Sequence, residues 1–250
     1  MRWLALDGAA NARVVVPGVL MRSDNLQTLS ARDVRLLVDQ EALEVVLDLR
    51  TEVEVELEGP GPITREPGVR IEHRSLYPRS GGNTDLEADS VNLWPQTDRS
   101  GWEDEAPVVQ AYLSYLTARP DSIVGSIRTI ATTRNAVLVH CAAGKDRTGM
   151  VVALSLDAAG VDRQAIVDDY LATAQRIDAI MARLVSSPTY RSELEGHDPR
   201  AHAPVPGTLE RVFELLDQRF GGSAAWLSAH GLSSEEIDQL RRRIMPAARD

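Results

Sequence analysis

Residues 137–149 read Val137-Leu-Val-His140-Cys141-Ala-Ala-Gly144-Lys145-Asp146-Arg147-Thr148-Gly149, and this stretch decides the fold. The apolar, partly β-branched run 136–139 predicts a buried strand, and the segment from Thr148 onward predicts a helix. A strand, a short loop and a helix in this order point several backbone N–H groups into one concavity. That concavity favours an anion, because the N–H groups at the helix N-terminus and the positive end of the helix dipole both face it.

The loop begins with a cysteine and carries an arginine six positions later. The field of the helix N-terminus favours the thiolate form of Cys141. Arg147 supplies a planar guanidinium that can hold two oxygens of a phosphoryl group. A thiolate beneath a bound phosphoryl group, with an arginine holding that group, is the machinery for phosphoryl transfer to cysteine.

The string His140-Cys141-x5-Arg147-Thr148-Gly149 resembles the signature of the cysteine-dependent protein tyrosine phosphatase superfamily. The full run 140–149 is similar to the bacterial branch typified by mycobacterial tyrosine phosphatase B. Arg22-Ser23-Asp24-Asn25-Leu26 and the segment 221–233 are also similar to that branch, so the resemblance extends across nearly the whole chain. It implies an α/β fold with a central, mostly parallel twisted sheet flanked by helices. It also implies activity on phosphotyrosine, often with phosphoserine, phosphothreonine or phosphoinositides as further substrates.

In the reaction that these residues predict, Cys141 attacks phosphorus and forms a phosphocysteine, and water then releases inorganic phosphate. Arg147 and the loop amides stabilise charge on the phosphoryl oxygens, and Gly144 permits the backbone conformation that the loop requires. Thr148 is a candidate hydrogen-bond donor to the thiolate, and His140 is expected to shape the surroundings of Cys141 without acting as a base. The expected phosphate-binding residues are Ala142, Ala143, Gly144, Lys145, Asp146, Arg147 and Thr148.

The leaving oxygen needs a proton, and Asp146 within the loop is the candidate general acid. The resembled branch carries the same aspartate and has been proposed to use it in this way; the other interpretation makes Asp146 a charge partner of its neighbours. Trp94-Pro95-Gln96 is similar to the Trp-Pro-Asp acid loop of many tyrosine phosphatases, but a glutamine cannot donate the proton. Asp98 is a possible substitute acid two residues further on.

Asp48 and Arg50, at the end of the expected strand 43–49, have two interpretations. Asp48-Leu49-Arg50 stands at the carboxyl end of that strand, where open α/β sheets place groups that face a ligand. A matching Asp-Leu-Arg occurs in the resembled family, so Asp48 or Arg50 is a candidate support for the loop. An ordinary salt bridge at a strand end is the alternative.

A loop of this kind also fits functions other than phosphotyrosine hydrolysis. The positive charge of Lys145 favours a phosphoinositide phosphatase. An equal interpretation is that Lys145 is only a solvated surface side chain. A catalytically silent phosphoprotein-binding module needs no Cys141, and a sulfurtransferase with a persulfide there does not require the Arg-Thr-Gly continuation. The P-loop of nucleotide enzymes is excluded, because Asp146 stands where that motif has Ser or Thr.

Composition restricts the partners and the compartment. A net charge of −10 argues against nucleic acid or an anionic membrane as a partner. A single cysteine excludes an intramolecular disulfide and fits a reducing compartment. One Cys and five scattered His show no metal-ligand spacing, so neither a metal nor another cofactor is expected. The start of the chain does not read as a signal peptide, and no apolar run approaches a membrane span. We therefore expect a cytoplasmic protein, although some relatives of the resembled family are reported outside the cell without a signal sequence.

The chain predicts a single phosphatase domain over residues 1–250. Strands are expected on either side of Pro17-Gly18 and over 43–49 and 69–76. Helices are expected after the N-caps Ser30 and Ser233 and over 106–118, 121–133, 164–185, 209–220 and 224–230. The segment 77–105 is rich in turn residues and is expected to be an irregular loop, which makes it a candidate lid. Residues 186–250 are expected to form a C-terminal helical segment of the same domain, beginning with a loop to 207.

Overall fold

The computed structural model describes residues 1–77, 102 and 104–246. Within these residues, one mixed sheet has the strand order β1-β2-β3-β6-β4-β5. The strands β1 (Arg2–Trp3), β2 (Arg13–Val16) and β3 (Leu20–Ser23) pair in antiparallel fashion. The strands β3, β6 (Ala136–His140), β4 (Leu43–Asp48) and β5 (Arg70–His73) are parallel neighbours. The predicted mostly parallel sheet is therefore confirmed, with a short antiparallel edge.

The register of the parallel strands brings the candidate residues together. His140 at the end of β6 is the partner of Ser23 on one side and of Asp48 on the other. Asp48 in turn is the partner of His73 at the end of β5. Because parallel strands end at the same edge, the chain leaves β3, β4, β5 and β6 on one side of the sheet, where open α/β folds bind ligands.

Alternate residues of β6 face opposite sides of the sheet, because side chains in a strand point alternately up and down. Val137 and Val139 belong to the larger hydrophobic core, whereas Ala136 and Leu138 belong to a smaller core on the other face. All four side chains are buried. This burial on both faces explains why the segment reads as a continuous apolar run and not as an alternating one.

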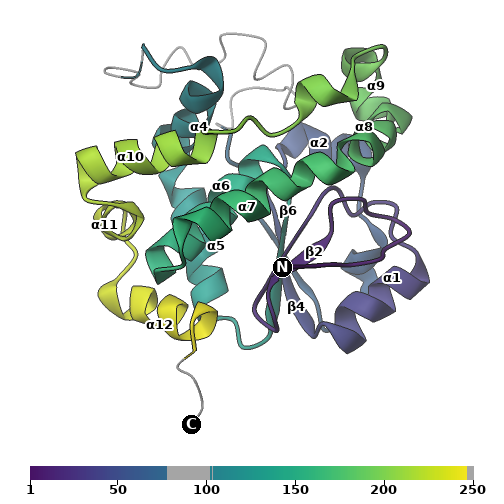
Figure 1. The fold of residues 1–250 in the computed structure, drawn as a ribbon. Helices are drawn as coiled ribbons and strands as arrows, with labels where there is room; N and C mark the ends of the chain where they lie inside the picture. Colours follow the sequence, from purple (N-terminus) through teal and green to yellow (C-terminus); the bar gives the residue numbers. More distant parts are fainter. Residues whose placement is uncertain (78–101, 103, 247–250) are drawn as a thin grey trace.

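Helices cover the two faces unequally (Figure 1). The smaller core is closed by α1 (Ala31–Arg35), a π-helical turn (Leu36–Gln40) and a 3-10 turn (Pro62–Arg65). The larger core is closed by α4 (Pro107–Ala118), α5 (Pro120–Thr132), α6 (Asp146–Ala159), α7 (Arg163–Ala172), α10 (Thr208–Phe220), α11 (Ser223–Ala229) and α12 (Ser234–Ile244).

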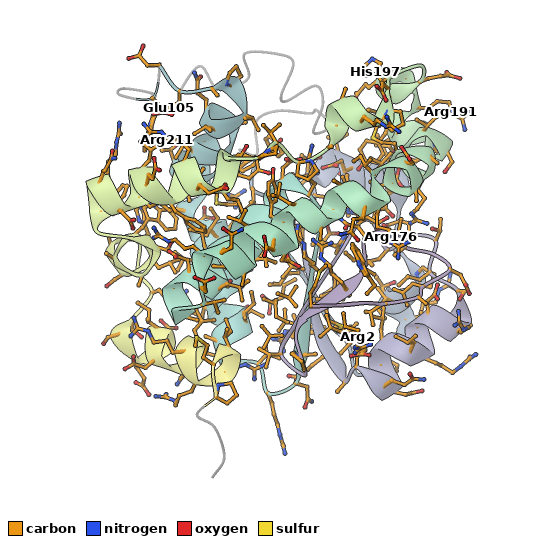
Figure 2. The ribbon with its side chains drawn as sticks, in the orientation of Figure 1. Arg2, Glu105, Arg176, Arg191, His197 and Arg211 are labelled. Atoms are coloured by element: carbon orange, nitrogen blue, oxygen red, sulfur yellow. The ribbon has the colours of Figure 1, made fainter. Side chains whose placement is uncertain are left out.

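On the surface of the larger layer, α10 is tied to the chain just before α4. Arg211 of α10 forms an ion pair with Glu105, with the closest nitrogen and oxygen 2.6 Å apart. Figure 2 shows these two side chains together at one corner of the molecule. A third group of helices lies beyond the carboxyl edge of the sheet: α2 (Glu52–Glu58), α8 (Ile177–Ser186) and α9 (Pro188–Leu194).

Two segments differ from their predictions. The expected helix 164–185 is interrupted by a 3-10 turn, Thr173–Arg176, so that α7 and α8 are separate helices. The hydroxyl of Thr173 accepts a hydrogen bond from the buried Arg13 at this break, a long-range contact that local periodicity does not reveal. The expected loop 186–207 contains α9 and a second 3-10 turn, Pro199–His202. Serine capping boxes begin α1 and α12 as predicted.

A buried ionic cluster joins α7 to the antiparallel edge of the sheet. Asp169 of α7 accepts hydrogen bonds from Arg13 of β2 at 2.9 Å and from Arg22 of β3 at 2.7 Å. Burial opposes ionisation of Asp169, but Arg22 and then Arg13 outweigh it, so the pKa of Asp169 lies below its ordinary value. Burial and the nearby Arg22 lower the pKa of Arg13 to about 10, so Arg13 remains charged near neutral pH.

We predict that Asp169→Asn destabilises the protein by about 3 to 5 kcal/mol at pH 7, because two buried guanidinium groups lose their counter-charge. Urea unfolding measures this difference. The difference in unfolding free energy between wild type and variant should become smaller as the pH falls below about 4. A carboxyl group whose pKa is lowered by folding stabilises the native state fully above its pKa in the unfolded chain. This stabilisation disappears as the carboxylate of the native protein becomes protonated. Asp168→Asn, on the exposed side of the same helix, is the control and should change stability by less than about 0.5 kcal/mol.

Candidate active site

The loop 141–145 leaves β6 and enters α6, and it lies at the carboxyl edge between β3 and β4. Cys141 is 2% exposed and belongs to the larger hydrophobic core. The amide of Leu49, just after β4, donates to the carbonyl of His140 at 2.9 Å. Cys141 therefore directly follows a strand that is paired with β3 on one side and with β4 on the other.

The carbonyl groups of the loop accept hydrogen bonds from residues outside it. The Asn25 amide donates to the Ala142 carbonyl at 2.9 Å, and the Asn11 side chain donates to Ala143 at 2.9 Å. The Arg22 guanidinium donates to the Gly144 carbonyl at 2.7 Å. Because the C=O and N–H groups of one trans peptide unit point in opposite directions, the amides of residues 143–145 point away from these three donors. This is the arrangement that an anion requires.

Gly144 occupies a position that only glycine fits. Its φ angle is +67°, in the left-handed region. A Cβ atom there would lie 2.3 Å from the carbonyl oxygen of Ser23 at the end of β3. The predicted need for glycine is confirmed for the backbone conformation. The close approach of the loop to β3 is a second reason, which was not predicted.

Arg147 is fully buried and is held by an acidic residue that sequence reasoning missed. Its Nη1 and Nη2 atoms donate to Glu54 of α2 at 2.7 and 2.9 Å, and Nη1 also donates to the carbonyl of Leu49 at 3.1 Å. The hydroxyl of Tyr190 in α9 donates to Glu54 at 2.6 Å. Burial opposes ionisation of Glu54, but Arg147 outweighs it and keeps the pKa of Glu54 below its ordinary value.

A sequence signal for Glu54 was present. Thr51-Glu-Val-Glu54 is a capping box, in which the Thr51 hydroxyl accepts from the Glu54 amide and the Glu54 carboxylate accepts from the Thr51 amide. It begins a helix in a segment whose alternation of apolar and acidic residues hides the helical period. No comparable signal was present for Asn11, Tyr112 or Asp169, because their contacts join residues far apart in the chain.

Lys145 and Asp146 lie where the loop enters α6, and both side chains are partly exposed. The Tyr112 hydroxyl donates to Oδ1 of Asp146 at 2.8 Å, and Oδ2 lies 3.5 Å from the Lys145 ammonium. Lys145 donates to the carbonyl of His202 at 2.7 Å and is 17% exposed, so it is not a freely solvated side chain. Arg147 takes Glu54 as its charge partner, and Asp146 keeps a partly exposed carboxylate.

His140, Asp48 and Arg50 form a buried group behind the cysteine. Arg50 and Asp48 form an ion pair with a closest distance of 2.6 Å, and His140 lies 3.6 Å from Asp48. Burial lowers the pKa of His140, although Asp48 opposes this shift, so the ring is neutral near pH 7. Burial would raise the pKa of Asp48, but His140 and Arg50 outweigh it and the net shift is downward. Asp48 and Arg50 therefore form the expected salt bridge, and it lies beside His140, the residue before Cys141.

Two further expectations concern single residues. The Thr148 hydroxyl is buried and has no hydrogen-bond partner within the described part of the chain. Asp98 and Trp94-Pro95-Gln96 lie outside the described residues, as does most of the possible lid 77–105. Within the described ranges, no group of three or more His, Cys, Asp or Glu side chains is placed to hold a metal ion. No helix there is long and apolar enough to span a membrane.

Comparison with known proteins places this geometry in a family. Residues 5–246 match the tyrosine phosphatase family. The triple specificity protein phosphatase PtpB of Mycobacterium tuberculosis is 26% identical over 96% of this chain and 95% of its own length. A tyrosine-protein phosphatase of Nostoc commune is 32% identical over 54% of this chain and 48% of its own length.

Among solved structures, the core catalytic domain of the PP-IP phosphatase SIW14 from S. cerevisiae matches 65% of this chain and 75% of that chain, with a TM-score of 0.38 and 15% identity. The family assignment rests on the match over residues 5–246, which includes the loop and every strand from β2 onward. The chain belongs to the tyrosine phosphatase family and is an enzyme of the phosphatase class.

Proposed function

We propose that this protein is a cysteine-dependent phosphatase that hydrolyses phosphotyrosine in proteins through a phosphocysteine at Cys141. One observation carries the proposal: the only cysteine of the chain begins a loop whose carbonyl groups are bonded outward, with Arg147 at the start of the following helix. We further propose that residues 1–250 act as one phosphatase domain. A reducing compartment such as the cytoplasm suits this chemistry, because the thiol must stay reduced.

In the first step, the Cys141 thiolate attacks phosphorus, the sulfur–phosphorus bond forms, and the bond to the leaving oxygen breaks with its electron pair on that oxygen. Loop amides from Ala142 to Arg147, with the Arg147 guanidinium, stabilise charge on the equatorial oxygens. Asp146 gives its proton to the leaving oxygen. In the second step, water attacks phosphorus, Asp146 takes a proton from it, and the thiolate leaves with the Thr148 hydroxyl as its hydrogen-bond donor.

Attraction of the substrate must be local. The net charge of −10 repels a phosphorylated substrate at long range, and Arg147 is buried beside a carboxylate that balances its charge. Binding therefore depends on the amides of the loop and the dipole of α6, which act within a few ångströms. Short-range recognition of this kind favours a phosphoryl group that projects far enough to reach a buried thiol.

A phosphoinositide is the second candidate substrate. Lys145 places an ammonium at the rim of the loop, although in this structure it donates to the His202 carbonyl. The name of the mycobacterial relative, a triple specificity protein phosphatase, supports activity beyond phosphotyrosine. A silent phosphoprotein-binding module is disfavoured by the presence of both Cys141 and Arg147.

We predict that the wild-type protein hydrolyses p-nitrophenyl phosphate without added metal and that orthovanadate inhibits it. Cys141→Ser should reduce the rate by at least about 1,000-fold, because a serine hydroxyl at this position has no general base to activate it. Phosphate release and vanadate binding are measured together, since the variant should still bind the oxyanion. Activity that survives in Cys141→Ser would contradict the mechanism.

The same assay separates the two substrate classes. A phosphotyrosine peptide should be turned over faster than soluble inositol phosphates at equal concentration. A large preference for the inositol phosphates would replace the protein substrate by a lipid headgroup, while leaving the role of Cys141 intact.

We also predict that Glu54→Gln weakens both the fold and the binding of orthovanadate. The buried Arg147 loses its counter-charge, which should cost about 3 kcal/mol of unfolding free energy, and its guanidinium loses the bidentate contact that orients it. We expect a fall in vanadate affinity of about tenfold or more, equivalent to about 1.4 kcal/mol.

Glu56→Gln is the matched control for this measurement. Glu56 lies in the same helix but is exposed, so its substitution should leave vanadate affinity and urea unfolding nearly unchanged. If the Glu54 and Glu56 variants bind vanadate equally well, Glu54 does not orient Arg147.

A further inference from the structure

The two oxygens of the Asp146 carboxylate have different surroundings. Oδ1 accepts a hydrogen bond of 2.8 Å from Tyr112, a side chain of α4 that is 1% exposed. Oδ2 lies toward the Lys145 ammonium at 3.5 Å, and the Asp146 side chain as a whole is 31% exposed. Since Oδ1 is bonded to a buried hydroxyl, Oδ2 is the oxygen that remains on the open side of the loop.

Tyr112 is itself held by a second tyrosine. The hydroxyl oxygens of Tyr112 and Tyr170 are 2.9 Å apart. Tyr112 has one hydroxyl proton, and an ionised Asp146 can only accept, so Tyr112 donates to Asp146 and the proton between the tyrosines comes from Tyr170. The donors therefore run in one direction, from Tyr170 through Tyr112 to Asp146.

Tyr112 is a permanent donor. Burial, followed by the charge of Asp146, raises the pKa of Tyr112 well above its ordinary value. Burial and Asp146 likewise raise the pKa of Tyr170. Both hydroxyls keep their protons over the whole range in which a phosphatase works, so neither tyrosine exchanges a proton with the substrate.

We infer that Tyr112 is a positioning residue for the general acid: its hydrogen bond to Oδ1 leaves the transferable proton of Asp146 on Oδ2, facing the leaving oxygen. This inference rests on the proposed function, in which Asp146 is that acid. In the neutral acid, Oδ1 is the carbonyl oxygen that accepts from Tyr112, and Oδ2 carries the proton. As the phosphorus–oxygen bond breaks, that proton passes to the leaving oxygen and Asp146 becomes a carboxylate.

The hydroxyl can be removed without disturbing the packing of the ring. The Tyr112 ring lies edge to face with Tyr170, with centroids 6.2 Å apart, and 6.1 Å from Tyr115. Phenylalanine keeps both contacts. Tyr115→Phe, one turn further along α4, is a matched control, because the Tyr115 hydroxyl lies against Tyr77 at 3.2 Å and not against Asp146.

The experiment compares kcat/KM for 4-nitrophenyl phosphate, which has a good leaving group, with that for phenyl phosphate, which has a poor one. Loss of a general acid slows the poor leaving group selectively, so Asp146→Asn should lower turnover of phenyl phosphate by about 100-fold more than that of 4-nitrophenyl phosphate. Tyr112→Phe should show the same selectivity at about tenfold, and Tyr170→Phe a smaller effect in the same direction. Tyr115→Phe should keep the wild-type ratio.

Orthovanadate affinity is measured for each variant as a control for the structure of the loop. In Tyr112→Phe it should equal the wild-type value. If Tyr112→Phe slows both substrates equally, or leaves the ratio unchanged while Asp146→Asn alters it, Tyr112 does not position the acid. If Asp146→Asn leaves the ratio unchanged, there is no acid for Tyr112 to position and the inference is wrong. Neither result bears on the proposed phosphatase activity, which the Cys141→Ser variant tests separately.

Discussion

The carbonyl oxygens of the loop are bonded to residues outside it, and the direction of the loop amides depends on these bonds. Asn11, Arg22 and Asn25 all come from the first 25 residues of the chain, whereas the loop begins at residue 141. The antiparallel edge of the sheet therefore has a chemical role, because β3 delivers two of these donors beside β6. Asp169 then holds Arg22 in place from α7. The proposed anion site therefore consists mostly of backbone groups, and their direction depends on one charged side chain, Arg22, and on the amide groups of Asn11 and Asn25.

Tyrosines connect this loop to its surroundings. The five tyrosines of the chain are all buried, and each lies within one or two contacts of the loop. Tyr190 reaches Arg147 through Glu54, and Tyr112 bonds directly to Asp146. The Tyr77 ring lies 5.4 Å from the Arg147 guanidinium carbon. A tyrosine suits these positions because its ring packs in the core while its hydroxyl orients a charged group. Asp146 and Arg147 are thereby linked to α2, α4, α7 and α9.

Much of the fold and the centre of the site were predictable from local sequence. Residues 136–149 predict strand, loop and helix in that order, and the capping serines begin their helices where the pattern indicates. Local patterns also explain the failures. The break at Thr173 depends on Arg13, which is 160 residues away in the chain. Glu54 was missed because its helix is short and its apolar residues alternate, although the capping box Thr51-Glu54 marks the helix start. The hydrogen bond between Tyr112 and Asp146 forms only when α4 packs against α6, so local sequence does not reveal it.

The central claim is that phosphate passes through the thiol of Cys141. Rapid quenching in denaturing alkali during turnover of a phosphotyrosine peptide labelled with ³²P, followed by peptide mapping at alkaline pH, tests it most directly. Alkali preserves phosphocysteine, whose sulfur–phosphorus bond hydrolyses fastest in mild acid. We expect the label to appear on the peptide that contains Cys141 and to disappear as substrate is exhausted. Label on a different residue, or product formation with no labelled protein at any time during the first turnover, would contradict the account.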